Sequence, residues 1–457
     1  MKKLFRKSGW MLPALALAWL WPVAARAAEE SETGVPGLDA DQINVLIVLA
    51  VVGVAYLVTH LVLERLAERF GFVTGVEYIV LGALVGPVLG LVEPETFRGL
   101  APVVVLGTGS LGLLAGLYFD RKEFDTDRIR ALWVAAIISV ITLAVMLAVP
   151  SAILLQLWEP EHLYRAMPVL MAVAAVAMVA DGGPLRSLAA LLGAEGRAAE
   201  FAAEVARFCS AFAIVAFGLV FCFFNSTSLP FETAPTWRWA VWLGIHLLLG
   251  GVLGIIFTNF LRRDFSDEKI ITVIIGMVIF TSGVAYYLQL SPIFVNFIMG
   301  IVLINTCSYA DHVQSRLMSI HRPLYIVLFF FGGAGWSLEA NWWGYALVIG
   351  YVVLRRFARY LGSFTAGRVA HSSPVVESGL ARPLLTPGAL SVAMVLNFYG
   401  VYEHLDHSHM LHNGLLVAIV LTELFSYPVT RNWLIDVAHV TPSEVDAVGD
   451  RDAGEAS

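Results

Sequence analysis

The sequence has 457 residues, of which 58% are hydrophobic and only 14% are charged, and its formal net charge is -7. A soluble chain of this composition could not cover its surface with polar groups. The composition therefore excludes a soluble globular protein and predicts an all-α polytopic membrane protein. Nothing in it indicates a nucleic-acid partner, and the three cysteines have neither metal nor redox spacing, so no cofactor is expected.

Residues 1–27 show the order of regions typical of a cleavable signal peptide. Basic residues (Lys2, Lys3, Arg6 and Lys7) precede the apolar run "MLPALALAWLW", and Ala25-Arg26-Ala27 supplies small residues for cleavage. The alternative is an uncleaved first membrane span. We expect cleavage, which leaves an acidic mature N-terminus outside the cell.

Apolar windows of about 20 residues, the length that crosses a bilayer core, recur about thirteen times in residues 28–434. They begin near Asp41, Gly75, Ala101, Arg130, Tyr164, Glu200, Thr236, Lys269, Ser291, Pro323, Asn341, Leu384 and Met410. Lys and Arg gather in alternate loops, which predicts a mature N-terminus outside and a cytoplasmic C-terminus. We expect the protein to lie in the bacterial inner (plasma) membrane. Residues 28–434 are thus one transmembrane domain, and residues 435–457 are expected to be a disordered cytoplasmic tail.

The stretch "AVAAVAMVADGGPLRSLAALLG", residues 172–193, places Asp181 and the helix breakers Gly182, Gly183 and Pro184 inside an apolar run. A central aspartate costs about 2.5–3.5 kcal/mol on the membrane-insertion scale. A helix break inside a bilayer must be buried in protein or line a cavity. Both together favour an ion site, where helix ends supply partial charges and Asp181 a titratable one. The alternative is that "GGP" ends the span and Asp181 reaches water.

A second interrupted span occurs roughly two hundred residues later, in "RPLLTPGALSVAMVLNFYG". It contains Thr386, Pro387 and Gly388, and the predicted topology gives it the opposite direction to the first. Two interrupted helices of opposite direction are typical of the substrate site of an inverted-repeat transporter. The repeat is inferred from topology alone, since the two halves show no clear self-similarity.

Further charged residues lie within predicted spans. Glu200, Glu204 and Arg207 follow helical spacing and share one face. Glu204 and Arg207 are equally consistent with a local ion pair and with a functional role.

In "YALVIGYVVLRRFARYLGSF", Arg355 and Arg359 share one helix face and Arg356 points elsewhere. Arg359 is a candidate to neutralise an inward-facing carboxylate. For Arg356 and Glu423 we expect internal ion pairs or side chains that reach the inner headgroups.

The order and spacing of six motifs resemble the monovalent cation:proton antiporter superfamily, the sodium/proton and potassium/proton exchangers. The motifs are "VEYIVLGALVGP", "LGTGSLGLLAGLYFDRK", "SPIFVNFIMGIVLINT", "RPLYIVLFFFGGAGW", "LRRFARYLGSF" and "LTPGALSVAMVL". The resemblance implies two crossed, partly unwound helices, in a core domain that moves against a dimerisation domain, and hence a homodimer. It places Asp181 in the first unwound segment, Thr386 to Gly388 in the second, and Arg359 at the basic position of the family.

One segment departs from the family pattern. Members usually carry one or two aspartates, or an Asn-Asp pair, in the span after the first break, whereas this chain has Phe208, Cys209 and Ser210 there. These residues cannot exchange a proton for a cation. Asp181 or Glu204 has taken over the role, or the ion differs, or the exchange is lost.

The leading hypothesis is a secondary transporter that exchanges Na⁺ or K⁺ for protons by alternating access. Asp181 is the first candidate for the ion-binding and proton-coupling carboxylate and Glu204 the second. Thr386 and free carbonyls would be neutral oxygen ligands, and Arg359 and Arg207 would balance charge. The alternatives are a non-transporting membrane sensor or assembly partner, and an organic-anion transporter on the same fold. We do not expect an enzyme.

A histidine-rich segment, "YEHLDHSHMLHN", lies in a predicted outer loop. His404, His407, His409 and His412 with Glu403 and Asp406 have the side chains that suit a transition metal such as Zn²⁺. The preferred interpretation is a solvated polar loop, and no metal is assigned.

Overall fold

A computed structural model describes residues 75–88, 101–157, 160–194, 196–227, 237–261, 267–307, 310–336, 342–369, 379–402 and 408–438. Throughout these ranges the regular structure is helical, without strands, which confirms the all-α prediction. The predicted signal peptide, most of the tail, and His404 and His407 lie outside the described residues.

The chain divides into two compact units. The first comprises Met1–Ala101 and Phe329–Leu338, and its described helices are α3 (Val76–Ala83) and the π-helix η1 (Leu84–Val88). The end of α13 also belongs to it. Gly82 and Gly333 let these segments approach closely, because a β-carbon at either position would collide with a backbone oxygen of the facing segment.

The second unit holds the remaining residues, and its helices follow the predicted windows. They are α5 (Ala101–Leu117), η2 (Arg121–Glu123), α6 (Thr126–Leu157), α7 (Pro160–Ala177), α8 (Gly183–Leu191), α9 (Arg197–Phe223), α10 (Arg238–Leu261), α11 (Asp267–Tyr287), α12 (Pro292–Thr306), α13 (Ala310–Ala334), α14 (Trp342–Val369), η4 (Pro383–Leu385), α16 (Gly388–Tyr402) and α17 (Ser408–Ala438). Two of these cross the boundary, because α5 begins and α13 ends in the first unit.

Five described segments are long and apolar enough to cross a membrane: Thr126–Leu157, Arg197–Phe223, Arg238–Leu261, Pro383–Tyr402 and Ser408–Val437. Helices α5 and α12 are apolar but shorter than 18 residues. These helices agree with a membrane protein, and the number of thirteen spans stays a prediction.

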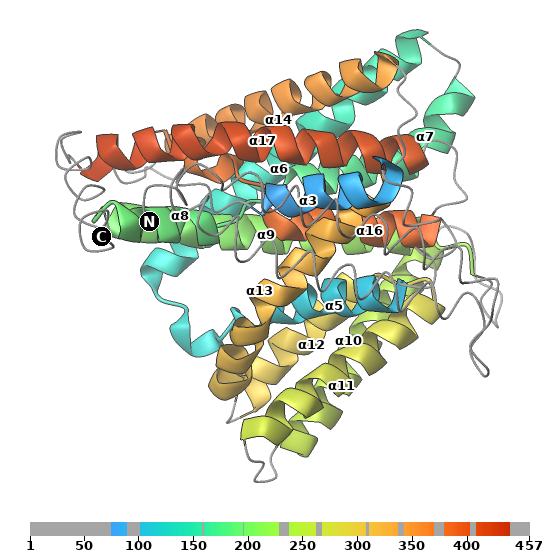
Figure 1. Ribbon diagram of the computed structural model, residues 1–457, viewed down its shortest axis with the longest axis vertical. Coiled ribbons are helices and arrows are strands. Elements are labelled where there is room, and N and C mark those ends of the chain that lie inside the picture. Colours follow the sequence, from blue (N-terminus) through green and yellow to red (C-terminus); the bar gives the residue numbers. More distant parts are fainter. Residues whose placement is uncertain are drawn as a thin grey trace, which may run out of the picture. The chain divides into compact units, whose positions relative to one another are not determined.

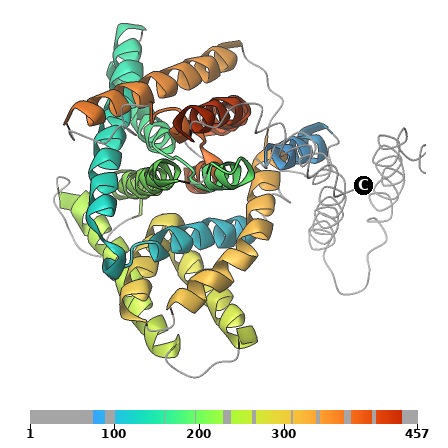
Figure 2. The same cartoon turned by 90° about the vertical axis from the view of Figure 1, so that its left-hand side faces the viewer.

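Two large hydrophobic clusters of described residues lie in the second unit, together with a smaller one around Trp242 of α10. The first joins α6, α8, α9, α14, η4 and α17, and alanines such as Ala135 on α6 and Ala203 on α9 let the helices pack closely. The second joins α5, α10, α11, α12 and the first half of α13. Helix α9 contacts α6, α7 and α8 on one side and α10 and α12 on the other. Figures 1 and 2 show α9 (green) between α14 and α17 (orange and red) and α10 to α12 (yellow-green to yellow).

Both interrupted spans are present, and the first break begins earlier than predicted. Helix α7 ends at Ala177 and α8 begins at Gly183, so residues 178–182 are not helical. The prediction that Gly183 and Pro184 lie in the break is therefore wrong: they form the first turn of α8, with Gly182 as its N-cap. Proline suits the first turn of a helix because it has no backbone N–H, and the N–H groups of that turn have no acceptor within the helix.

The second break lies between η4 and α16. Thr386 and Pro387 are not helical. Gly388, predicted to be part of the break, is the first residue of α16 and has a φ of 65°. The break is thus short.

Candidate functional site

The two breaks are in direct contact. The Asp181 backbone N–H in the first break donates to the Thr386 carbonyl in the second, with a separation of 2.9 Å. Thr386 is only 5% exposed, and Pro387 and Gly388 are buried beside it. Two segments about two hundred residues apart in sequence therefore meet inside the helix bundle.

The Asp181 carboxylate is held by a donor on each oxygen. Oδ1 accepts from the Gly183 N–H at 2.8 Å, in the first turn of α8. Oδ2 accepts from the Tyr325 hydroxyl at 2.6 Å, and Tyr325 lies on α13. The same hydroxyl accepts from the Ala389 N–H of α16 at 3.2 Å. Asp181 is half-buried, so this carboxylate joins three helices while keeping some exposure.

Gly388 lies between Asp181 and a second acid. A β-carbon at this position would collide with the Asp181 carboxylate, and its φ of 65° lies in the left-handed region that favours glycine. The Gly388 N–H donates to Glu423 Oε1 at 2.7 Å, and Glu423 on α17 is 1% exposed. For Glu423 the expectation was an internal ion pair or a side chain that reaches the inner headgroups; the second alternative is wrong, because the buried carboxylate caps α16.

Arg355 binds both breaks with one guanidinium. Its Nε donates to the Ala177 carbonyl at 3.1 Å and its Nη2 to the Val179 carbonyl at 2.8 Å. Its Nη1 donates to the Leu385 carbonyl at 2.6 Å. Ala177 is the last residue of α7 and Leu385 is the last residue of η4. Arg355 therefore joins the C-terminal ends of both interrupted segments.

Arg359, one turn further along α14, binds the first break alone. Its Nη2 donates to the carbonyls of Ala177 at 3.1 Å and Val179 at 2.8 Å, and also to that of Met178. Arg359 is fully buried, whereas Arg356 is exposed and lies over the Tyr360 ring. The helical periodicity predicted this division between the three arginines.

Fixed charges complement the helix ends at both breaks. Carboxylates lie at the N-termini of α8 and α16, where the helix dipole is positive. Guanidiniums lie at the C-terminal ends of α7 and η4, where it is negative. The expectation of free carbonyl ligands needs correction, because the carbonyls of residues 177–179 already accept from arginines.

Ser210 occupies the region where the family usually carries carboxylates, and it also contacts the first break. Its hydroxyl donates to the Ala180 carbonyl at 2.6 Å and accepts from the Ala180 N–H at 3.3 Å. Phe208 instead packs edge-on against Phe119, and Cys209 is buried. The span after the first break thus supports the loop with a hydroxyl and carries no acid there.

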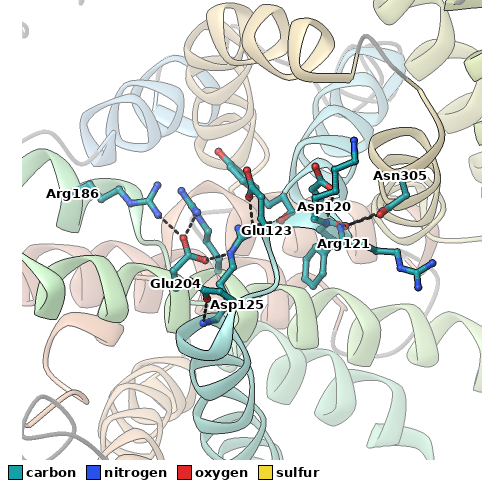
Figure 3. A network of polar contacts seen from close by, with 12 residues as sticks. Asp120, Arg121, Glu123, Asp125, Arg186, Glu204 and Asn305 are labelled. Atoms are coloured by element: carbon teal, nitrogen blue, oxygen red, sulfur yellow. Dashed lines mark hydrogen bonds and ion pairs between the residues drawn. The ribbon is translucent and has the colours of Figure 1, made fainter.

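Glu204 lies in an ion-pair cluster of its own, which Figure 3 shows with Glu204 facing Arg186. Its carboxylate pairs with Arg128 of α6 at 3.4 Å, Arg186 of α8 at 3.2 Å, and Arg207 of its own helix. Arg207 also lies over the Tyr118 ring, 4.4 Å from its centre. The contacts described for Glu204 and Arg207 are therefore made within this cluster and with neither break.

The loop that follows α5 completes the network of Figure 3. Arg128 also pairs with Glu123 at 2.6 Å. The Arg121 N–H donates to Asn305 Oδ1 at 3.0 Å, and Asn305 Nδ2 donates to the Phe119 carbonyl at 2.9 Å. The loop is thereby tied to α12 and to the helices around Glu204.

The described histidines of the proposed metal segment do not form a cluster. His409 Nδ1 lies 2.9 Å from the Tyr399 hydroxyl, and the His412 ring packs against the same tyrosine. Among the described residues, no group of three His, Cys, Asp or Glu side chains could hold a metal.

The sequence matches the model of the sodium/hydrogen exchanger transmembrane family over residues 54–431. The chain belongs to this family. The match covers most of the sequence and confirms the resemblance seen in its motifs. In the comparison with curated proteins, no sequence matches this chain.

The exchanger-family fold is also found in a solved structure. The sodium proton antiporter MjNhaP1 from Methanocaldococcus jannaschii aligns with a TM-score of 0.64 at 16% identity, over 86% of this chain and 98% of that one. At this identity the likeness establishes the antiporter fold. Together with family membership, it makes the protein a membrane transporter of the sodium/proton antiporter type.

Sequence reasoning missed three of the residues that meet at the breaks. Arg355 was visible as the partner of Arg359 on one face, yet its role was not assigned. Glu423 was seen only as a charge within a span. Tyr325 carried no signal, because one tyrosine in an apolar helix is an ordinary core residue.

Proposed function

We propose that the protein exchanges a monovalent cation, Na⁺ or K⁺, for protons by alternating access, with Asp181 as the carboxylate that both ions share. The observation that carries this proposal is the place of Asp181, half-buried at the contact between two interrupted helices. A single carboxylate binds either a proton or a cation, and that competition suffices for exchange. Protein oxygens such as the Thr386 hydroxyl suit hard cations.

The charges around the breaks support one exchanging group. With Asp181 and Glu423 ionised, their two negative charges offset the positive charges of Arg355 and Arg359. A proton or a monovalent cation on Asp181 then gives the same net charge. Arg359 takes the charge-balancing role in this proposal, and Arg207 balances Glu204 in its separate cluster.

We place ion coupling on Asp181 rather than Glu204. The Glu204 carboxylate forms ion pairs with three arginines. A cation that binds Glu204 would have to displace at least one of these guanidiniums. Among the described residues, the hydrogen-bond donors to the Asp181 carboxylate are neutral: the Gly183 N–H and the Tyr325 hydroxyl. A cation approaching Asp181 therefore does not have to displace either of these donors against a like charge.

An organic-anion transporter is less well supported by this geometry. An anion would bind at the half-helix N-termini, where backbone N–H groups are free to donate. The Asp181 and Glu423 carboxylates occupy these places. The Arg355 guanidinium, a second possible anion partner, already donates to three carbonyls.

The test is ion flux in proteoliposomes that contain a pH-sensitive dye. A pH gradient is imposed across the proteoliposome membrane, and NaCl or KCl is then added. The added salt should dissipate the pH gradient in vesicles with the native protein and should leave it in vesicles with Asp181→Asn. Glu204→Gln is the matched carboxylate control and should retain exchange. Full exchange by Asp181→Asn would refute the carboxylate assignment, and cation binding without flux in the native protein would indicate a sensor.

The proposal includes a homodimer in the bacterial inner membrane, with an inverted repeat and a cytoplasmic C-terminus. The mass of the detergent-solubilised protein by light scattering tests the dimer. Labelling of a cysteine introduced in the C-terminal tail, in intact and in opened cells, tests the orientation. Labelling in intact cells would refute the cytoplasmic C-terminus.

A further inference from the structure

We propose that Tyr325 is a positioning residue for ion exchange, one that holds Asp181 Oδ2 in the cation-free state and has to release it before a cation binds. The inference rests on the proposed function of Asp181. It begins from the 2.6 Å separation between the Tyr325 hydroxyl and Oδ2. That separation is typical of a hydrogen bond to a carboxylate and leaves no space for a cation between the two oxygens.

The two donors on Asp181 differ in their freedom to leave. The Gly183 N–H belongs to the first turn of α8, and its position is fixed by the backbone two residues from Asp181. The Tyr325 hydroxyl belongs to a side chain on another helix, 144 residues away in sequence. Oδ2 is therefore the oxygen that becomes available, because only its donor can move without unwinding α8.

The orientation of the phenol is set by a second contact. Its oxygen accepts from the Ala389 N–H at 3.2 Å, and this N–H lies in the first turn of α16, where helix amides have no partner within the helix. With that amide on its oxygen, the hydroxyl directs its hydrogen at Oδ2. The hydrogen of the Tyr325 hydroxyl thus occupies the side of Oδ2 that a cation would have to bind.

The contact also joins the first break to α13, a helix whose N-terminal half packs in the other hydrophobic cluster. Ala180, next to Asp181, packs in the cluster of α6, α8 and α9, whereas Val313 and Leu317 of α13 pack in the cluster of α5 and α10 to α12. Alternating access requires groups of helices to move relative to each other. Movement of α13 relative to the first break would make or break the Tyr325 contact, which links cation entry to the conformational step.

The test compares Tyr325→Phe with the native protein in proteoliposomes and by calorimetric titration of the purified protein with NaCl and KCl. Phenylalanine keeps the ring and removes the hydroxyl. Loss of a hydrogen bond that competes with the cation should lower both the apparent KM and the Kd about ten-fold, with turnover changed less than two-fold. Tyr402→Phe is the control, because Tyr402 packs against Phe221 and Phe398 in the last turn of α16.

Asp181→Asn separates this inference from the proposed function. An inactive Asp181→Asn with an unchanged or raised Kd in Tyr325→Phe overturns the role of Tyr325 and leaves the function of Asp181 intact. Retained exchange in Asp181→Asn overturns the proposed function. If Tyr325→Phe cannot be purified as a monodisperse protein, Tyr325→Leu replaces it, with the same expected direction and the same refuting result.

Discussion

Replacing Gly388 by alanine should lower both the free energy of unfolding and the rate of ion exchange. Both decreases should be larger than those from a glycine-to-alanine change at another position with a left-handed backbone. The position combines a φ of 65° with direct contact to Asp181. Gly193 provides a matched control, because its φ of 60° is nearly the same and no described atom lies within 4 Å of an added β-carbon. The two variants share the backbone effect and differ in the steric one.

The expected magnitudes follow from these two terms. A left-handed backbone costs a residue with a β-carbon roughly 1–2 kcal/mol, which is nearly the whole effect in Gly193→Ala. In Gly388→Ala the β-carbon would also lie 2.6 Å from Asp181 Cβ and 2.8 Å from its Cγ, so the side chain has to move. Losing one hydrogen bond to the charged carboxylate adds about 1.5–3 kcal/mol. The total for Gly388→Ala is about 2.5–5 kcal/mol.

Thermal unfolding in detergent, followed by tryptophan fluorescence, measures the stability difference, and proteoliposome flux measures exchange. Gly388→Ala should unfold at a clearly lower temperature than Gly193→Ala and lose exchange, whereas Gly193→Ala should keep it. Equal unfolding temperatures and equal flux in the two variants would refute the contact between Gly388 and Asp181 as the basis of the site.

Three further outcomes are expected from single substitutions. Arg355→Met should lower the free energy of unfolding by about 3 kcal/mol, since the Leu385 carbonyl loses its described donor and the carbonyls of Ala177 and Val179 keep only Arg359. The exposed control Arg356→Met should change it by about 0.5 kcal/mol or less in the same thermal assay. Glu204→Gln should lower the free energy of unfolding by about 1 kcal/mol, and by less at high salt, because the ion pairs of Glu204 are partly exposed. An unfolding temperature of the native protein that does not change with salt would contradict this expectation. Ser210→Ala should cost about 1 kcal/mol by removing the partner of the Ala180 backbone, and an unchanged melting temperature would rule that out.

The class of the protein and the position of its breaks could be predicted from the sequence because both depend on local chemistry. Long apolar windows indicated membrane helices, and the glycines and prolines near Asp181 and Gly388 indicated interruptions. The first break was misplaced by part of a turn. Proline and glycine disfavour a helix interior yet suit its first turn, and the sequence pattern does not distinguish these two cases.

Helical periodicity also placed Arg355 and Arg359 together on one face of α14. It could not show that their partners are backbone carbonyls of another segment. Carbonyls occur at every residue and carry no sequence signal, so this contact becomes visible only when α7 ends against α14.

The sequence by itself determined that this is a helical membrane protein of the exchanger type, with an aspartate at the first of two interruptions. Only the tertiary structure decided which side chains surround that aspartate. Tyr325 reaches it from 144 residues away, and Glu423 reaches Gly388 from 35 residues away. Tyr325 lies in the apolar part of α13, Pro323–Ala334, and Glu423 lies in the apolar α17, where periodicity does not reveal which side chain faces which neighbour. The direction of these two side chains is set by packing between distant helices.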